Sequence, residues 1–153
     1  MMDGKHKEER EPRRVRVFFY GTFMSPEVLA RYGINVENVT PARVQNFDIY
    51  IRPRVNLISK TGASVYGGVV SVTHEALDRI YQSLEKQFGL KYLPEAVLAE
   101  PIERTAESEP VLCFITAKME PGAPDPEYVR ELATCVRALK LPESYALHIE
   151  SFS

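Results

Sequence analysis

The sequence predicts an α+β fold in which helices pack around a small, mixed, strongly curved or barrel-like β-sheet. Two observations lead to this prediction. About five short apolar or alternating segments have the lengths and compositions of strands, and about four helical segments lie among them without strict alternation. This order differs from the regular β-α-β repeat of a doubly wound parallel sheet. With 153 residues, the chain has the length of one domain, which we expect over 15–153 after a flexible charged arm over 1–14.

Charge and hydropathy exclude several classes of partner. The chain has 19 Lys and Arg residues against 21 Asp and Glu residues, and its formal net charge is -2. It therefore lacks the excess of positive charge that holds a nucleic-acid backbone or an anionic membrane surface. No apolar run approaches the roughly 20 residues of a membrane helix, and the charged N-terminus is unlike a signal peptide. We expect a cytoplasmic protein that binds neither nucleic acid nor membranes.

The two cysteines do not predict a metal site. Cys113 lies in an apolar run and Cys135 on the apolar side of a predicted helix, with no C-x-x-C and no histidine at ligand spacing. We interpret both as buried free thiols, with a disulfide or a reactive thiol as the alternative.

The N-terminal elements are a strand, a sharp turn and a short helix. The run at 15–20 is β-branched and aromatic and stops at Gly21, which predicts a buried strand followed by a turn. Ser25 is a candidate N-cap and Pro26 suits the first helical position, so a short helix is predicted that ends at Gly33.

Two further strands are predicted before the longest helix. Residues 42–51 alternate apolar and polar side chains, and residues 64–72 continue as a strand after a loop or ragged hairpin at 52–63. The pair Gly67-Gly68 predicts either a bulge or a close approach of another backbone.

The second half of the chain predicts the remaining helices and strands. Thr73 is a plausible N-cap for a helix with apolar residues at three-to-four spacing, and Gly89 ends it. Asp125 caps a helix from Glu127 to about Leu139, and a short last helix follows Pro142. Two strands are predicted between these helices, at 92–102 and 110–117, joined by a turn at 103–109.

The common sequence signatures of catalysis are missing. There is no G-x-G-x-x-G, no P-loop lysine motif, no G-x-S-x-G and no H-E-x-x-H. The three histidines, His6, His74 and His148, do not lie beside a turn that would expose a nucleophile. We therefore expect neither a metal nor a cofactor.

The turn that follows the first strand is the strongest candidate site. A buried strand leads through Gly21 into a helix start, and successive backbone N–H groups in such a turn can hold a carboxylate or an oxyanion. The alternative is an ordinary strand-to-helix turn in which Tyr20 and Phe23 belong to the core.

A second candidate is Glu85, which borders the apolar stripe of the long helix because it follows Leu84. Partial desolvation would suit such a carboxyl to general acid or base chemistry near neutral pH. The alternative is a solvated glutamate in a helix, where this residue type is common.

Several segments together resemble the γ-glutamylcyclotransferase and AIG2-like family. The run FFYGTFM at 18–24 is similar to the Y-G-(T/S)-L turn that opens that family, and the resemblance continues to about residue 148. The other similar segments come in the same order as in the family: Val65-Tyr66-Gly67-Gly68, Tyr92 with Pro94-Glu95-Ala96-Val97, the stretch 123–128, and Leu141-Pro142 with Tyr145.

The resemblance implies a reaction and a set of site residues. Members of the family cyclise a γ-glutamyl group to 5-oxoproline and release the amine, without metal or cofactor. The released group would be an amino acid, an amine or a peptide, so the expected partner is a small γ-glutamyl substrate. One carboxylate between the attacking α-amino group and the departing amine can move both protons. The residues implied are Glu85 as the acid/base, Tyr20, Gly21, Thr22, Phe23 and Met24 as the substrate cradle, and Tyr128 as a lid contact.

The sequence departs from the family around the glutamate, which usually lies in L-D-x-x-E-G. Glu85 stands in the stretch IYQSLEKQFG, where Lys86 replaces the usual glycine, and another register would put Phe88 at the catalytic position. Glu75 and Glu95 are weaker substitutes. The alternatives to an enzyme are therefore a binding module for a γ-glutamyl group or small carboxylate, and a scaffold whose turn only packs.

One loop carries two arginines that are candidates for substrate recognition. Arg52 and Arg54 flank Pro53, and a guanidinium at this loop could pair with a distal carboxylate of the substrate. The alternative is that both arginines are solvated loop residues.

Overall fold

The computed structural model describes residues 13–103, 107–117, 119 and 122–152. Within these residues five strands form a closed barrel in the order β1-β3-β2-β4-β5. Neighbouring strands are antiparallel, except that β1 pairs with β5 in parallel. The α+β prediction with a barrel-like sheet is confirmed. The strands are β1 (Arg14–Phe19), β2 (Thr40–Ile51), β3 (Val55–Thr73), β4 (Tyr92–Pro101) and β5 (Glu109–Thr116).

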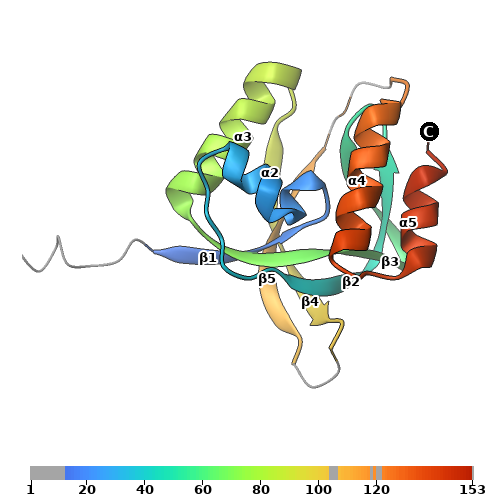
Figure 1. Ribbon diagram of the computed structural model, residues 1–153, viewed down its shortest axis with the longest axis horizontal. Helices are drawn as coiled ribbons and strands as arrows, with labels where there is room; N and C mark the ends of the chain where they lie inside the picture. Colours follow the sequence, from blue (N-terminus) through green and yellow to red (C-terminus); the bar gives the residue numbers. More distant parts are fainter. Residues whose placement is uncertain (1–12, 104–106, 118, 120–121, 153) are drawn as a thin grey trace, which may run out of the picture.

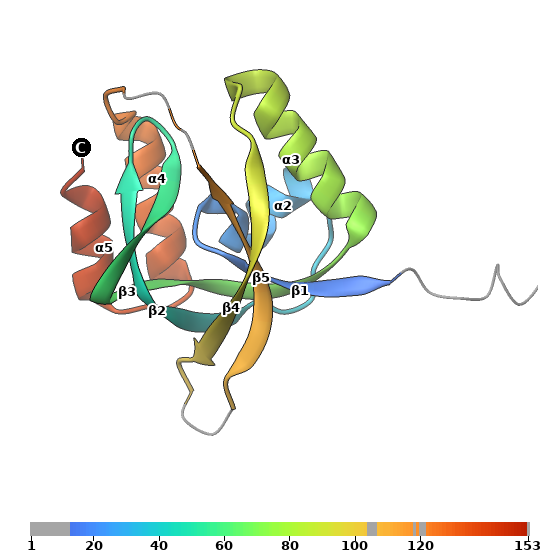
Figure 2. The same ribbon diagram turned by 180° about the vertical axis from the view of Figure 1, so that it is seen from behind.

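The helices gather on one side of the barrel in two groups (Figure 1). They are the 3-10 turn η1 (Thr22–Met24), α2 (Pro26–Arg31), α3 (His74–Phe88), α4 (Pro126–Ala138) and α5 (Glu143–Glu150). One group contains α2 and α3, and the other contains α4 and α5, which lie beside the far end of the β2–β3 hairpin in both views (Figure 2). The turn η1 contacts both α2 and α4, so it lies where the two groups meet.

Three of the predicted helix ends are confirmed by their hydrogen bonds. The Thr73 hydroxyl accepts from the Ala76 amide at 3.1 Å, and the Asp125 carboxylate accepts from the Glu127 amide at 3.0 Å. Gly89 ends α3 in the left-handed region at φ 67°. Ser25, in contrast, makes no side-chain cap bond, and α2 begins at Pro26 without one.

The segment at 52–63, predicted as a loop or a ragged hairpin, is part of a hairpin: residues 52–54 form the turn between β2 and β3, and the residues that follow belong to β3. The strand β3 already starts at Val55 and is 19 residues long. Ile51 pairs with Val55, and the pairing continues along the strands to Phe47 and Ser59. The proline and glycine residues are typical of a loop, but Pro53 lies in the turn itself. There its lack of an N–H group costs no hydrogen bond between the strands.

Close packing explains the pair Gly67-Gly68, and the alternative of a bulge at these glycines is wrong. Both glycines pair in regular register with β1 or β2. A Cβ on Gly67 would lie 2.2 Å from the carbonyl oxygen of Phe19, so only glycine lets the two backbones approach this closely. The register shift lies instead between Gln45 and Phe47 of β2, which pair with Ser64 and Ser59 of β3.

Both cysteines are buried and free, as expected. Burial raises the pKa of Cys113 to about 12 and that of Cys135 to about 11, so both thiols stay protonated at neutral pH. Of the arm expected at 1–14, only Arg13 and Arg14 are among the described residues, and Arg14 already belongs to β1. None of the described helices has both the length and the apolarity needed to cross a membrane.

Candidate functional site

The turn that leaves β1 presents unused backbone donors. The amide of Met24 donates to the carbonyl of Gly21 at 3.1 Å and the amide of Ser25 to that of Thr22 at 3.0 Å, which closes the 3-10 turn. Within the described part of the chain, no hydrogen bond engages the N–H groups of Thr22 and Phe23. Adjacent free N–H groups of this kind favour the binding of an anion.

Gly21 packs closely against β3 and α4. A Cβ at this position would lie 2.9 Å from Cγ1 of Val55 and 3.2 Å from the hydroxyl oxygen of Tyr128. Tyr128 is buried in the first turns of α4, which places its phenol next to the turn after β1. The structure therefore brings Tyr128 and the predicted cradle together.

A small cavity of about 40 Å³ lies beside this turn. A water molecule needs a space of at least about 10–15 Å³, so the cavity has room for a small polar group such as a carboxylate. Its lining is mostly aromatic and includes one cation, that of Arg54. The lining residues are Phe18, Phe19, Tyr20, Gly21, Thr22, Phe23, Arg54, Val55, Tyr81, Leu84, Tyr92, Phe114 and Tyr128.

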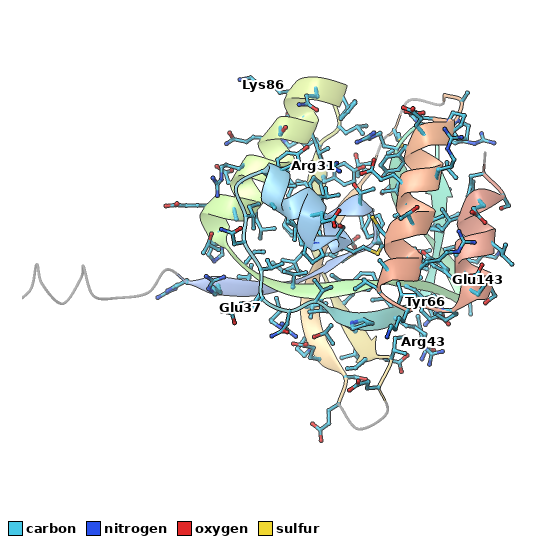
Figure 3. All side chains as sticks on the ribbon, in the orientation of Figure 1. Arg31, Glu37, Arg43, Tyr66, Lys86 and Glu143 are labelled. Carbon is cyan, nitrogen blue, oxygen red and sulfur yellow. The ribbon has the colours of Figure 1, made fainter. Side chains whose placement is uncertain are left out.

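The cavity continues into a larger groove on the outside. This outer groove, of about 440 Å³, shares Thr22, Phe23, Arg54 and Tyr128 with the cavity. Arg31 reaches across the groove from α2, and its nitrogen lies 3.4 Å from a carboxylate oxygen of Glu131 on α4 (Figure 3). A ligand with its head in the cavity would therefore have its remainder in this groove.

The tyrosines of the cavity are neutral hydrogen-bonding groups. The Tyr20 hydroxyl donates to the carbonyl of Phe114 at 2.6 Å, and that of Tyr92 donates to the carbonyl of Val55 at 2.8 Å. Burial raises the pKa values of Tyr20, Tyr81, Tyr92 and Tyr128 above the ordinary value for a phenol. A phenol that holds its proton this firmly cannot act as a general base at neutral pH.

Glu85 does not line the cavity. Its side chain is exposed, whereas Tyr81 and Leu84 of the same helix face the cavity. A helix advances about 100° per residue, so the residue after Leu84 turns toward the solvent. The next residue, Lys86, points outward near the C-terminal end of α3 (Figure 3). The structure thus does not place a Glu85 carboxylate opposite the amides of the turn.

The other predicted substitutes are no closer to the cavity. Glu75 and Glu95 are exposed, and Glu95 lines a separate groove between β2 and β4. Phe88, the alternative catalytic position, is 44% exposed and stacks under Arg54 outside the cavity lining. Met24 was expected to be part of the substrate cradle. It is fully buried in the core, and it is not among the residues that line the cavity.

Comparison with known proteins now identifies the family. The model of the family "Gamma-glutamyl cyclotransferase, AIG2-like" matches residues 17–135, and the chain belongs to this family. Among curated protein sequences, none matches the chain.

Solved structures share the fold. A protein titled "Gamma-glutamyl cyclotransferase" superposes with a TM-score of 0.76 at 15% identity, covering 92% of this chain and 89% of its own. A human protein titled as uncharacterized, loc79017, has a TM-score of 0.78 at 15% identity and 92% and 88% coverage. An Arabidopsis thaliana protein, At3g28950.1, has a TM-score of 0.59 at 21% identity and 92% and 85% coverage. At these identities the matches show a common fold.

The structure also shows a residue that the sequence analysis missed. The family motif L-D-x-x-E-G can be laid on residues 77–82 without a gap: Leu77 and Asp78 match it, Tyr81 stands in place of the glutamate and Gln82 in place of the glycine. Leu77 is buried in the core, and Asp78 accepts a hydrogen bond from Gln82 at 3.0 Å. The adjacent Leu-Asp pair was the signal that could have identified this register.

The site offers anion-binding groups without a metal centre. Across the described residues, no three His, Cys, Asp or Glu side chains come together in a way that could hold a metal ion. Nor does any Asp or Glu among them line the cavity. The chemistry available there consists of backbone N–H groups, neutral phenols and one guanidinium.

Proposed function

We propose that this protein binds the carboxylate of a small γ-glutamyl compound in the cavity beside Gly21, as a binding module of its family. One observation carries the proposal: the cavity combines free amides at Thr22 and Phe23 with Tyr81 where the family motif has its glutamate. The amides favour a carboxylate, and the neutral phenol of Tyr81 leaves no lining group that would accept the proton of an α-amino group.

The size of the cavity supports this mode of binding. A space of about 40 Å³ accommodates the carboxylate end of the ligand, and the outer groove of about 440 Å³ accommodates the γ-amide and the group attached to its nitrogen. Aromatic walls exclude water from the carboxylate, which strengthens its hydrogen bonds to the amides.

Titration calorimetry and product analysis test this proposal together. We expect a γ-glutamyl amino acid to bind with a stoichiometry of one and to be recovered without formation of 5-oxoproline. Glycine amide, which has no carboxylate, is the control ligand and should not bind. Absence of binding by the γ-glutamyl compound would reject the proposal.

A second candidate is the cyclotransferase reaction itself, with Glu85 as the general acid and base. It is favoured by the family of the chain and by the position of Glu85 directly after Leu84, which lines the cavity. The glutamate would have to turn inward when substrate binds. General acid-base catalysis contributes about a hundred- to ten-thousand-fold, so Glu85→Gln should abolish almost all release of 5-oxoproline. Equal turnover by the wild type and Glu85→Gln would exclude this role for Glu85.

A further inference from the structure

Arg54 stands at the boundary between the cavity and the outer groove. It lines both spaces, together with Thr22, Phe23 and Tyr128. Its backbone is fixed by the β2–β3 turn, where its carbonyl accepts from the amide of Arg52 at 3.0 Å. A ligand that extends from the cavity into the groove has to pass this guanidinium.

Two aromatic rings hold the guanidinium in place. The Cζ atom of Arg54 lies 4.2 Å from the ring centroid of Phe88 on α3 and 4.3 Å from that of Tyr128 on α4. Stacking of this kind uses the face of the planar group and leaves the N–H donors at its edge available. Since Phe88 and Tyr128 limit its rotamers, less conformational entropy is lost when an anion binds.

The donors of Arg54 have no anionic partner in the described structure. No hydrogen bond or ion pair within the described ranges uses its side-chain nitrogens. The other arginine of the groove, Arg31, is instead engaged with Glu131. The acidic residues of the groove come from the α4 side and are Asp125, Glu127 and Glu131. The electrostatic attraction for an anionic group of the ligand is therefore strongest at Arg54.

We propose that Arg54 selects γ-glutamyl compounds that carry a second carboxylate beyond the γ-amide, which are γ-glutamyl amino acids and peptides, over γ-glutamyl amines. The proposal rests on the proposed function, because it assumes that the first carboxylate is bound at the turn after β1. The second carboxylate accepts edge-on hydrogen bonds from the guanidinium, which is the geometry that arginine and carboxylates favour. Arg54 is thus a specificity-determining residue.

The test compares two ligands on the same protein. γ-Glutamylglycine and γ-glutamylglycinamide differ only in the distal carboxylate, and calorimetry gives the ratio of their dissociation constants. A charge-assisted hydrogen bond at a partly exposed site is worth roughly a factor of ten in affinity. We expect the wild type to bind the acid about tenfold more tightly than the amide, Arg54→Gln to bind both about equally, and Arg54→Lys to show an intermediate ratio.

Arg52→Gln is the matched control. Arg52 lies in the same turn but is exposed and does not line either space, so its loss should leave the tenfold ratio unchanged. Because the ratio is taken within each variant, loosening of the Phe88 and Tyr128 contacts in Arg54→Gln does not imitate the effect. A ratio near one in the wild type, or a ratio that survives in Arg54→Gln, would overturn the role of Arg54. If neither ligand binds the wild type, the proposed function fails first, and the inference fails with it.

Discussion

The ring of Tyr81 lies nearly parallel to the ring of Phe114, with centroids 4.2 Å apart and an interplanar angle of 18°. Tyr81 is also 5.8 Å from the ring of Tyr92, so three aromatic residues from α3, β4 and β5 meet in the cavity wall. This cluster occupies the place where the family motif supplies a carboxylate. Under the proposed binding function, the packed phenol of Tyr81 stands where a catalytic carboxylate would move the proton.

Tyr81→Glu is expected to introduce cyclotransferase activity. A carboxyl among these rings is desolvated, which raises the pKa of a carboxyl toward neutral pH and suits it to general base catalysis. We expect 5-oxoproline from γ-glutamyl amino acids to rise at least a hundredfold above the wild type. Loss of the aromatic contacts should lower the free energy of unfolding by about 2–4 kcal/mol.

Tyr81→Gln is the control for this gain, because it has nearly the same size as the glutamate but no basic carboxylate. It should show the same loss of stability and no turnover. If both variants are inactive although both bind the substrate, Tyr81 does not occupy the catalytic position of the family.

Gly21→Ala is expected to weaken ligand binding. The added Cβ would lie 2.9 Å from Cγ1 of Val55 and 3.2 Å from the hydroxyl oxygen of Tyr128, so the turn or these side chains, all of which line the cavity, must shift. We expect at least a tenfold increase in the dissociation constant of a γ-glutamyl amino acid and a loss of about 1–3 kcal/mol in the free energy of unfolding. In the control Gly122→Ala the nearest atom is 3.6 Å away, on Pro53, so binding should not change. Unchanged affinity in Gly21→Ala would separate the turn from the binding site.

Local signals predicted much of the fold. The caps Thr73 and Asp125 fix helix starts through hydrogen bonds within three residues, so the sequence around them contains the necessary information. The sequence left open whether 52–63 is a loop or a hairpin, because the pairing of residues 55–59 with β2 forms the strand while the local composition indicates a loop.

The candidate site was predicted only in part, because contacts between elements far apart in the sequence determine the rest. Gly21 and Tyr128 were recognised, and the structure brings them together from distant parts of the chain. Glu85 lies one helical turn after Tyr81 at the edge of the same face of α3, and helical periodicity alone does not determine whether Glu85 also reaches the cavity. The contacts of Tyr81 with Phe114 and Tyr92, which come from other elements, decide this orientation.

Stability should fall at alkaline pH. Burial raises the pKa values of Tyr20, Tyr81, Tyr92 and Tyr128, while in the unfolded chain tyrosines titrate near pH 10. The folded protein therefore binds more protons than the unfolded chain above that pH, and its stability, fully present below about pH 10, decreases as the pH rises.

Urea unfolding between pH 8 and pH 12 measures this decrease. Each buried phenol contributes a slope of about 1.4 kcal/mol per pH unit above about pH 10. The absorbance of tyrosinate should show that these phenols ionise together with unfolding. Ionisation of all tyrosines near pH 10 in a protein with unchanged circular dichroism would contradict the expected shifts.

Asn56→Ala is expected to destabilise the barrel next to the cavity. The Asn56 side chain is 2% exposed, donates to the carbonyl of Thr116 at 2.7 Å and accepts from the amide of Thr116 at 3.2 Å. It also donates to the hydroxyl of Tyr50 at 3.0 Å, and so it joins β3 to β5 and β2. Removal of buried hydrogen bonds to backbone groups costs about 1–3 kcal/mol each, so the free energy of unfolding should fall by about 2–4 kcal/mol.

The exposed Asn38 is the control, because Asn38→Ala should stay within about 0.5 kcal/mol of the wild type. Because Asn56 directly follows Val55, which lines the cavity, Asn56→Ala should also weaken ligand binding. An equal loss of stability in Asn56→Ala and Asn38→Ala would show that the Asn56 amide does not hold the strands together.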